Sequence, residues 1–451
     1  MDDNAMRIKQ AIEINIDKNN IEEAYKLAEQ YVTLEPNDSD GYYLLGYLCI
    51  VKNQYEQAKS ILERGMCLNE KNANLNFTFA NLLCREGNSS GAFKYFCRAK
   101  LFDPLIGFNI NYKNDFSKAH VIFGSMEIAN QMYTSVEGLK ALGIHAASVN
   151  YYPSYLGYKA DYMLDLPSYK SIEQADLETK KIASDLISEN NLFHFYFGTT
   201  LTLDYSDLPL IKELGKKAVM QYWGSDVRMY TKAVKLNKYV KVKDMNEDQI
   251  KRKLEFLSHY IPDCLVDYEL AEYVKDFHAN LHYIRPAIDL SKYKSIKNTI
   301  KDKPLIVHAP TSPEFKGTPY ILKAIDELQQ SYNFDFKLVQ NISHEEAVKI
   351  YEASDLVIDQ VLTGSYGLFS IEAMALGKPV VCLISDFMKE KYPKELPIIS
   401  ANPDNLKATL EYYLKNQELL LELGAKGRQY VEKYHDRNSI CLDLINIYNK
   451  L

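Results

Sequence analysis

The sequence has 451 residues, 47% of them hydrophobic, which is enough for two or three domains with separate cores. Its formal net charge of −7 argues against a protein that is held on nucleic acid by phosphate contacts. No stretch reaches the roughly 18 apolar residues of a membrane span, and the acidic start lacks the features of a secretory signal. The seven cysteines form no CxxC pair, which predicts a reduced, cytoplasmic protein without a structural metal.

A repeat of 34 residues runs through the first hundred positions. Ala24, Ala58 and Ala92 recur at this spacing, and Pro36 and Pro104 mark repeat boundaries. The pattern resembles tetratricopeptide repeats, in which small residues let paired helices approach closely and each pair buries its apolar face against the next. We expect three repeats over residues 1–104, the first of them degenerate. The alternative is an unspecialised helical extension.

From about residue 119 onward, buried strands alternate with helices. The segments 119–125 and 191–198 are typical of strands, and 126–143 and 172–190 of helices. A second run begins with a strand at 303–310 and continues with strands near 336–340, 355–359 and 379–384. This alternation predicts an α/β fold with two facing, doubly wound Rossmann-like domains, at 119–285 and 303–425. The polar, lysine-rich stretch 283–303 is the expected linker.

A glycine-rich turn follows the strand at 355–360. Its helix, "FSIEAMALG", carries Glu372 in its first turns, and Gly364 and Gly367 precede it. Parallel sheets bind ligands at the carboxyl ends of their strands, where helix N-termini offer N–H groups to anions. Glu372 there is suited to accept hydrogen bonds from a ribose diol. The alternative is a carboxylate that is only favoured by the helix dipole.

The segment "EAMALGKPVV" closely resembles the signature of the family 4 glycosyltransferases, which have the GT-B fold. The resemblance covers roughly residues 119–451. It implies that Glu372 holds the ribose of a nucleotide-diphosphate sugar and that the loop before it wraps the diphosphate and the sugar. That loop comprises Ser365, Tyr366, Gly367 and Leu368.

The chain departs from this family's pattern at three positions. A second Glu is expected eight residues before Glu372, where Gly364 stands. A phosphate-binding Lys matches Lys316, beside Gly317, but the Arg expected five residues earlier is Thr311, next to Ser312. A strand-end His is replaced by Trp223. Lys316 is still expected to neutralise the leaving diphosphate, whereas the alternative is a solvated surface lysine.

The loops of the N-terminal half supply further candidates. By the resemblance, Gly124 and Ser125 expose backbone to donor and acceptor, while Glu127 and Asn130 serve as helix caps or as part of the site. The turn Trp223, Gly224, Ser225 and Asp226 is expected on the acceptor side, with Asp226 contacting an acceptor hydroxyl. His194 is expected to be a structural strand residue.

A basic run is interpreted as a solvated face rather than as a contact with anionic lipid. Its members are Arg228, Lys232, Lys235, Lys238, Lys241 and Lys243.

Taken together, these features predict a metal-independent glycosyltransferase that moves a hexosyl group from a nucleotide-diphosphate sugar, with UDP-sugars favoured and with retention. No cofactor is expected.

The repeats suggest a protein or peptide acceptor. The second choice is a lipid-linked or surface-polysaccharide glycan, with the repeats recruiting a partner enzyme. Membrane contact is at most peripheral. A non-catalytic GT-B adaptor subunit is the competing interpretation. The last helix, at 426–451, is expected to cross back to the N-terminal Rossmann-like domain.

The predicted residues fall into three groups. Catalytic roles are assigned to Lys316, Glu372 and Asp226. The donor is expected to contact Gly124, Ser125, Thr311, Ser312, Lys316, Gly317, Gly364, Ser365, Tyr366, Gly367, Leu368 and Glu372. Trp223, Gly224, Ser225 and Asp226 form the acceptor side.

Overall fold

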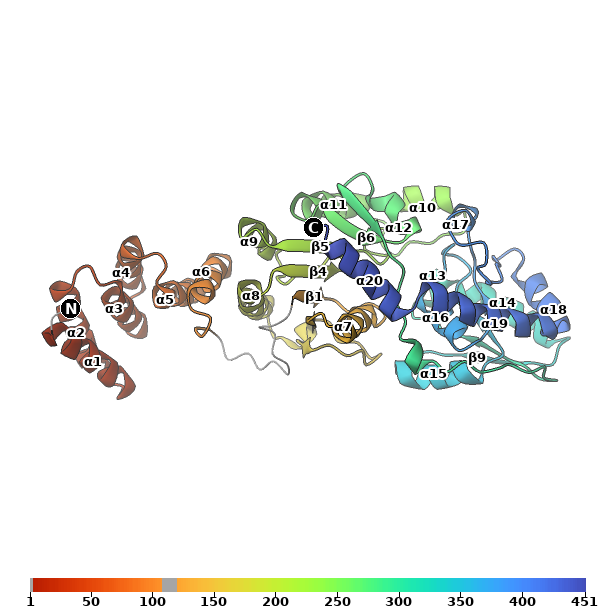
Figure 1. Ribbon diagram of the computed structural model, residues 1–451, viewed down its shortest axis with the longest axis horizontal. Helices are drawn as coiled ribbons and strands as arrows, with labels where there is room; N and C mark the ends of the chain where they lie inside the picture. The colour runs from red at the N-terminus through yellow and green to blue at the C-terminus, as the bar shows by residue number, and fades with distance from the viewer. Residues whose placement is uncertain (1–2, 108–119) are drawn as a thin grey trace. The chain divides into compact units, whose positions relative to one another are not determined.

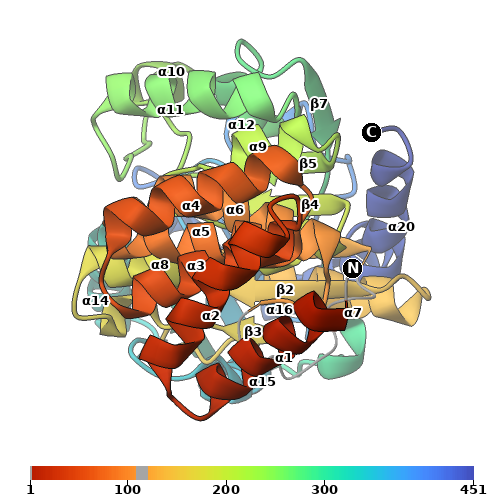
Figure 2. The ribbon, with the colours of Figure 1, turned by 90° about the vertical axis from the view of Figure 1, so that its left-hand side faces the viewer.

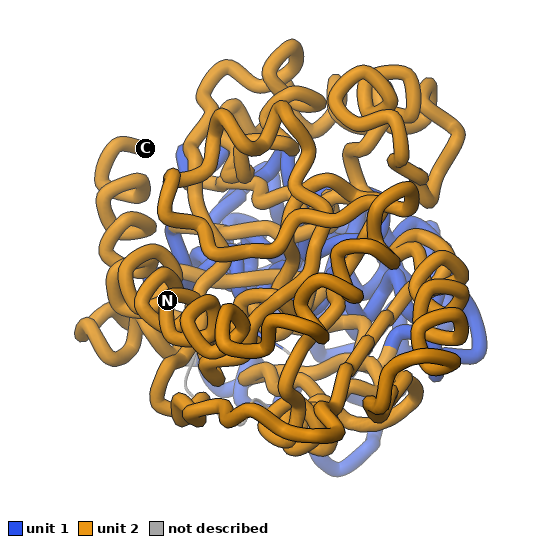
Figure 3. Tube along the Cα trace, turned by 90° about the vertical axis from the view of Figure 1, so that its right-hand side faces the viewer, with its two compact units in different colours: residues 1–120, 166–191, 200–216 blue, residues 121–165, 192–199, 217–451 orange. Residues whose placement is uncertain are grey.

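The computed structural model describes residues 3–107 and 120–451, and the chain divides into two compact units (Figures 1 and 3). The first unit comprises residues 1–120, 166–191 and 200–216. The second comprises residues 121–165, 192–199 and 217–451. Each unit has its own core and is described separately. The domain boundaries drawn from the sequence stay predictions.

The first unit begins with three helix pairs (Figure 2). Ala24, Ala58 and Ala92, which share the 34-residue spacing, are all fully buried where paired helices meet. The expected helical repeat region is therefore confirmed. The helices are α1 (Asp3–Asp17), α2 (Ile21–Leu34), α3 (Ser39–Val51), α4 (Tyr55–Leu68), α5 (Ala73–Arg85) and α6 (Ser89–Phe102).

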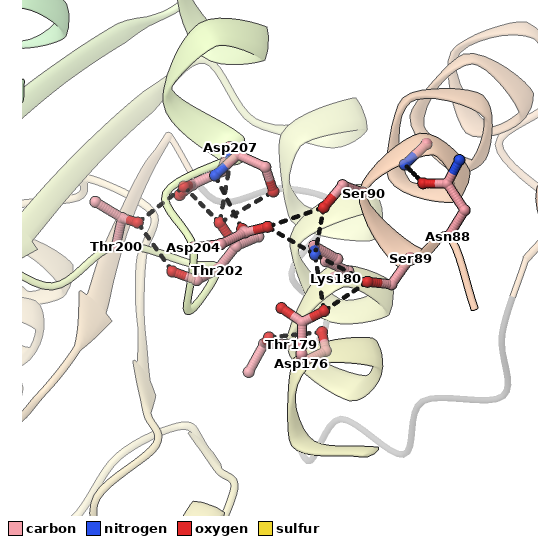
Figure 4. A network of polar contacts seen from close by, with 12 residues as sticks. Asn88, Ser89, Ser90, Asp176, Thr179, Lys180, Thr200, Thr202, Asp204 and Asp207 are labelled. Carbon is pink, nitrogen blue, oxygen red and sulfur yellow. Dashed lines mark hydrogen bonds and ion pairs between the residues drawn. The ribbon is translucent and has the colours of Figure 1, made fainter. Parts of the chain in front are cut away.

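The last repeat helix, α6, packs against α8 (Ile172–Glu189), a helix that lies far along the chain. Lys180 of α8 is almost completely buried between them (Figure 4). Its ammonium lies 2.8 Å from a carboxylate oxygen of both Asp176 and Asp204, and 3.2 Å from the hydroxyls of Ser89 and Ser90. The first unit also contains α9 (Asp207–Glu213) and the short 3-10 helix η2 (Leu166–Ser168).

The second unit contains two parallel sheets. The larger sheet has, within the described residues, the strand order β3-β2-β1-β4-β5-β6-β7. Because the order reverses direction between β1 and β4, this half is doubly wound, as predicted. Its strands are β1 (Val121–Ser125), β2 (Ala146–Asn150), β3 (Tyr162–Met163), β4 (Leu192–Tyr196), β5 (Lys217–Gln221), β6 (Asp263–Val266) and β7 (Asn280–Tyr283). Its helices within this unit are α7 (Gln131–Ala141), α10 (Tyr230–Leu236), α11 (Glu247–Tyr260) and α12 (Tyr268–Val274).

The smaller sheet has the order β11-β10-β8-β9, again all parallel. Neighbouring residues of β8 point to opposite faces: Ile306 joins one apolar cluster and Val307 the other. The strands are β8 (Leu305–His308), β9 (Asp335–Leu338), β10 (Leu356–Ile358) and β11 (Val380–Val381). The 3-10 helix η3 (Leu290–Lys292) precedes this sheet, and its helices are α13 (Pro313–Lys316), α14 (Thr318–Gln329), α15 (His344–Ala353), α16 (Leu368–Ala375), α17 (Asp386–Lys389) and α18 (Leu406–Lys415).

The C-terminal segment forms two helices, α19 (Gln417–Tyr434) and α20 (Arg437–Tyr448), so the single helix expected at 426–451 is wrong. The break occurs because Asp436 caps α20, accepting a hydrogen bond from the Ser439 N–H at 3.1 Å. α20 packs against α7 of the larger sheet, where Gly138 leaves room for the Cys441 sulfur. Within the described residues, no helix is long and apolar enough to cross a membrane.

Replacing Lys180 by Met should destabilise the first unit by about 3 kcal/mol, because removing one partner of a buried ion pair leaves carboxylates without compensation. Urea unfolding followed by circular dichroism measures this change. Lys181→Met is the matched control: Lys181 pairs with Glu178 near the surface, where the loss should stay below about 1 kcal/mol. Equal effects of the two variants would contradict the role given to Lys180.

Candidate active site

A cavity of about 340 Å³ lies within the second unit, at the carboxyl ends of strands from both sheets. Tyr222 and Asp267 directly follow β5 and β6 of the larger sheet, and Ala309 directly follows β8 of the smaller one. Parallel sheets place ligand sites at such edges, where the strand order reverses. Both sheets therefore contribute residues from the carboxyl ends of their strands to this cavity.

The glycine-rich turn, which runs from the end of β10 to the start of α16, is organised by Asp359. This carboxylate is completely buried and accepts hydrogen bonds from the Ser370 hydroxyl at 2.6 Å and from the Gly367 N–H at 3.2 Å. The Lys316 ammonium lies 2.5 Å from its other oxygen. Burial alone raises the pKa of Asp359, but attraction to Lys316 and these hydrogen bonds hold the pKa below its ordinary value. Asp359 is therefore a charged anchor beneath the turn.

Lys316 reaches this anchor from the loop that follows β8. Gly317, with φ of +85°, ends α13, and a Cβ at this position would lie 2.5 Å from the Val361 side chain. The Lys316 carbonyl accepts a hydrogen bond from the Val361 N–H at 3.0 Å. Glycine is thus required at 317 because the two cavity loops touch there.

Glu372 lines the cavity from α16 and is held by two other residues. Its Oε1 accepts hydrogen bonds from the Tyr293 hydroxyl at 2.9 Å and from His344 Nε2 at 2.6 Å. Within the described residues, Oε2 makes no hydrogen bond and remains an available acceptor. Burial acts to lower the pKa of His344, but the hydrogen bond and charge of Glu372 outweigh it and raise this pKa. Glu372 is therefore oriented with one oxygen free.

A second ion pair comes from the larger sheet's half of the unit. The Arg228 guanidinium forms two 2.7 Å hydrogen bonds with Glu269, one to each carboxylate oxygen. The Ser365 hydroxyl donates to Glu269 at 3.2 Å, which links the glycine-rich turn to the larger sheet's half. Gly224 is required beside this pair, because a Cβ there would lie 2.4 Å from Arg228.

The loop after β1 reaches the cavity through Ile128 and Ala129. Gly124 and Ser125 are not among the lining residues, and Ser125 is buried, with its hydroxyl 3.2 Å from that of Thr199. Glu127 caps α7: its carboxylate accepts hydrogen bonds from the N–H groups of Met132 at 3.0 Å and Tyr133 at 2.9 Å.

On the predicted acceptor side, only Trp223 lines the cavity. The Asp226 carboxylate turns back and accepts hydrogen bonds from the N–H groups of Trp223 and Gly224, the latter at 2.7 Å. Burial raises the pKa of Asp226 to about 6, against the effect of these N–H groups. Asp226 therefore stabilises the backbone of its own turn. His194 is fully buried outside the cavity, 2.6 Å from the Tyr448 hydroxyl.

The missing family glutamate at position 364 has a local explanation. Gly364 has φ of +90°, and a Cβ there would lie 2.8 Å from Asn237 and 3.0 Å from Ser385. The Asn237 amide donates to the Leu362 carbonyl at 2.6 Å, so the backbone of this turn is already held by a side chain. A larger residue at 364 conflicts with this packing.

The cavity brings together eight of the twelve predicted donor residues: Thr311, Ser312, Lys316, Ser365, Tyr366, Gly367, Leu368 and Glu372. Gly124, Ser125, Gly317 and Gly364 are not among its lining residues. Sequence reasoning missed several side chains of the site, namely Tyr158, Arg228, Lys243, Asp267, Tyr293, His344 and Asp359. Of these, only Asp359 had a clear signal, as a carboxylate at the end of an apolar strand.

The interpretation of the basic run as a solvated face is wrong for Arg228, which is only partly exposed and lines the cavity. Lys235, Lys238, Lys241 and Lys243 are exposed as expected, and Lys243 also lines the cavity. The helix α10 covers only part of the run, and the chain leaves helical geometry at Asn237. Among the residues that the structure describes, no group of three or more His, Cys, Asp or Glu is placed to hold a metal ion.

Comparison with known proteins adds the family context. Residues 318–445 match the family described as glycosyl transferase-like. The structure is similar to sucrose-phosphate synthase from Thermosynechococcus elongatus, with a TM-score of 0.54 and 15% identity over 73% of this chain and 98% of that one. No curated protein matches. Residues 318–445 are therefore similar to a glycosyl transferase-like family, and the structural similarity shows a shared two-sheet fold.

Two further structures are less similar, with TM-scores below 0.5. Anabaena HepE in complex with UDP-glucose has a TM-score of 0.49 and 10% identity over 73% of this chain and 99% of that one. A mutant of the O-GlcNAc transferase of Thermobaculum terrenum has a TM-score of 0.42 and 11% identity over 100% of this chain and 98% of that one.

Glu127 should make stability depend on pH. Burial raises the pKa of this carboxyl from 4.5 to about 7, against its backbone hydrogen bonds. The stability that depends on a neutral Glu127 is therefore fully present below pH 4.5. It is lost as the pH rises through 7, because the unfolded chain releases the proton more readily than the folded one. Relative to wild type, Glu127→Gln should gain up to about 3 kcal/mol between about pH 5 and 7.5, because the amide cannot ionise.

Urea unfolding at several pH values measures this difference. Glu137→Gln, on the exposed side of the same helix, is the control and should run parallel to wild type. If the pH dependence of the Glu127→Gln unfolding free energy also stays parallel to that of wild type, ionisation of the Glu127 carboxyl does not destabilise the fold and the prediction is wrong.

Proposed function

We propose that this protein is a glycosyltransferase that moves a hexosyl group from a nucleotide-diphosphate sugar to an acceptor, with retention of configuration. The observation that carries the proposal is the convergence of Lys316, Glu372 and the glycine-rich turn on one cavity at the strand ends of two parallel sheets. A cavity with a cation, a half-free carboxylate and exposed backbone has the groups that a sugar nucleotide needs. A UDP-sugar is the first donor to test.

Lys316 is the proposed ligand of the diphosphate. An ammonium has three N–H donors, and the ion pair with Asp359 uses one of them, so two remain for phosphate oxygens. Asp359 fixes where the charge lies, and Leu368 at the start of α16 lines the same cavity. The first N–H groups of a helix have no partner within it and favour anions.

Glu372 is the proposed ligand of the ribose. Its Oε1 is occupied by Tyr293 and His344, which fixes the carboxylate plane and turns Oε2 toward a ligand. A carboxylate oxygen accepts two hydrogen bonds from a vicinal diol at little cost when it is already oriented. His344 and Tyr293 act as positioning residues, because they act through Glu372.

In the proposed reaction, the bond between the donor's anomeric carbon and the β-phosphate oxygen breaks, and its electron pair leaves with the nucleoside diphosphate. A bond forms between that carbon and an acceptor hydroxyl oxygen, whose proton is released. The role of Lys316 is to stabilise the charge that develops on the leaving diphosphate. Asp226 is not part of this scheme, because its carboxylate is committed to the backbone of its own turn.

We further propose a protein or peptide as the acceptor, because the first unit carries helical repeats and such arrays present extended binding surfaces. Peptide segments are the usual ligands of surfaces of this kind, whereas a glycan on a lipid carrier gives the repeats no direct role. The acceptor assignment is independent of the donor site and is tested separately.

Glu372→Ala and Lys316→Ala should each weaken nucleotide-sugar binding by about tenfold or more, since each removes a charged hydrogen-bonding partner. The measurements are thermal shift and nucleoside-diphosphate release across a panel of UDP-, GDP-, ADP- and dTDP-sugars. Glu345→Ala, at an exposed position of α15, is the control and should behave like wild type. Binding without release in wild type would favour the adaptor interpretation, and no binding at all would refute the donor site.

Label from a radioactive donor should appear in protease-sensitive material when the enzyme is incubated with an extract of its own cells. Butanol extraction, acid precipitation and protease digestion separate lipid-linked, protein-linked and free glycan products. Label that enters the butanol phase would show a lipid-linked acceptor and would overturn the protein assignment. Glu372→Ala should add much less label than wild type above the level of the extract alone, because it binds the donor more weakly.

A further inference from the structure

Three cationic side chains line the cavity: Arg228, Lys243 and Lys316. Arg228 is neutralised by Glu269 and Lys316 by Asp359. Lys243 differs, because within residues 3–107 and 120–451 no carboxylate lies within ion-pair distance of it. Of these three cations, Lys243 is therefore the one that has no ion-pair partner among the described residues.

Lys243 belongs to the segment 237–246, which follows α10 and is attached to the smaller sheet's half of the unit. Asn237 donates to the Leu362 carbonyl, Tyr239 donates to Asp404, and the Lys241 ammonium lies 3.0 Å from Glu314. Val240 and Val242 alternate with these residues and are buried. These contacts hold the backbone that leads to Lys243 in place, and the Lys243 side chain lines the cavity.

The Lys243 ammonium lies over the Phe315 ring, 5.9 Å from the centroid, and this weak attraction helps to hold it at the cavity. Partial burial and the positive charges of Arg228 and Lys316 lower its pKa. A positive charge that has two others nearby and no paired carboxylate is stabilised by a bound anion, and the gain is largest for an anion with several charges.

We propose that Lys243 binds a phosphate group of the nucleotide-diphosphate donor together with Lys316. This inference rests on the proposed function. It gives the diphosphate a second cation where Thr311 carries none, and that cation comes from the segment that follows α10. Lys316 and Lys243 then contact one diphosphate from two segments that are distant in the sequence.

The test compares nucleoside diphosphate with nucleoside by isothermal titration calorimetry, using UDP and uridine, or the base that wild type prefers. Lys243→Ala should bind the diphosphate about tenfold or more weakly, with unchanged affinity for the nucleoside, because only phosphate contacts are lost. Lys243→Arg should stay within about threefold of wild type, since it keeps the charge. Lys238→Ala, an exposed lysine of the same segment that does not line this cavity, is the matched control.

Three results would overturn the inference. Lys243→Ala equal to Lys238→Ala would show that Lys243 does not touch the diphosphate. A parallel loss of nucleoside affinity would show that the substitution alters the cavity in general, and unfolding curves without ligand check the same point. If wild type binds no nucleoside diphosphate, the proposed function itself fails. Diphosphate binding in wild type with an unaffected Lys243→Ala refutes the role of Lys243 alone.

Discussion

The cavity depends on one buried charge, the carboxylate of Asp359. A fully desolvated carboxylate costs several kcal/mol unless a cation and hydrogen-bond donors surround it. Its partners come from the loop after β8, from the backbone of Gly367 and from the first turns of α16. Satisfying this single charge therefore fixes the relative positions of the groups that face the cavity. The ion pair with Asp359 fixes the position of the Lys316 ammonium, whose remaining N–H donors are available for a ligand.

Much of the fold follows from patterns that are local in the sequence. Apolar strands alternating with helices predicted two parallel sheets, and the 34-residue spacing of Ala24, Ala58 and Ala92 predicted three helix pairs. Lys316 and Glu372 stood out because each lies beside glycines at a turn from strand to helix, where parallel sheets bind ligands. Each of these signals is contained in a short stretch of chain, so one sequence is enough to detect them.

The rest of the site depends on contacts between distant segments, which carry no local signal. His344 and Tyr293 reach Glu372 from an α-helix start and from the region assigned as a linker. Arg228 finds Glu269 from another loop, and Lys243 was indistinguishable from the exposed lysines around it. The orientation of Asp226 toward its own backbone, and the break between α19 and α20, depend on capping geometry that a motif does not specify. Periodicity therefore predicted the scaffold, whereas the pairing of side chains around the cavity depends on the folded chain.

The helical repeats do not form a separable module. The compact unit that holds α1–α6 is completed by residues 166–191 and 200–216, which alternate along the chain with the strands β4 and β5 of the other unit. A truncation after α6 would leave that helix without α8, and removal of α6 would leave the buried Lys180 without Ser89 and Ser90. The two compact units are interleaved in sequence, so exchanging the repeat array would remove the helix that α8 packs against. Recombination that brings a new repeat array to this protein would have to preserve the face of α8 as well.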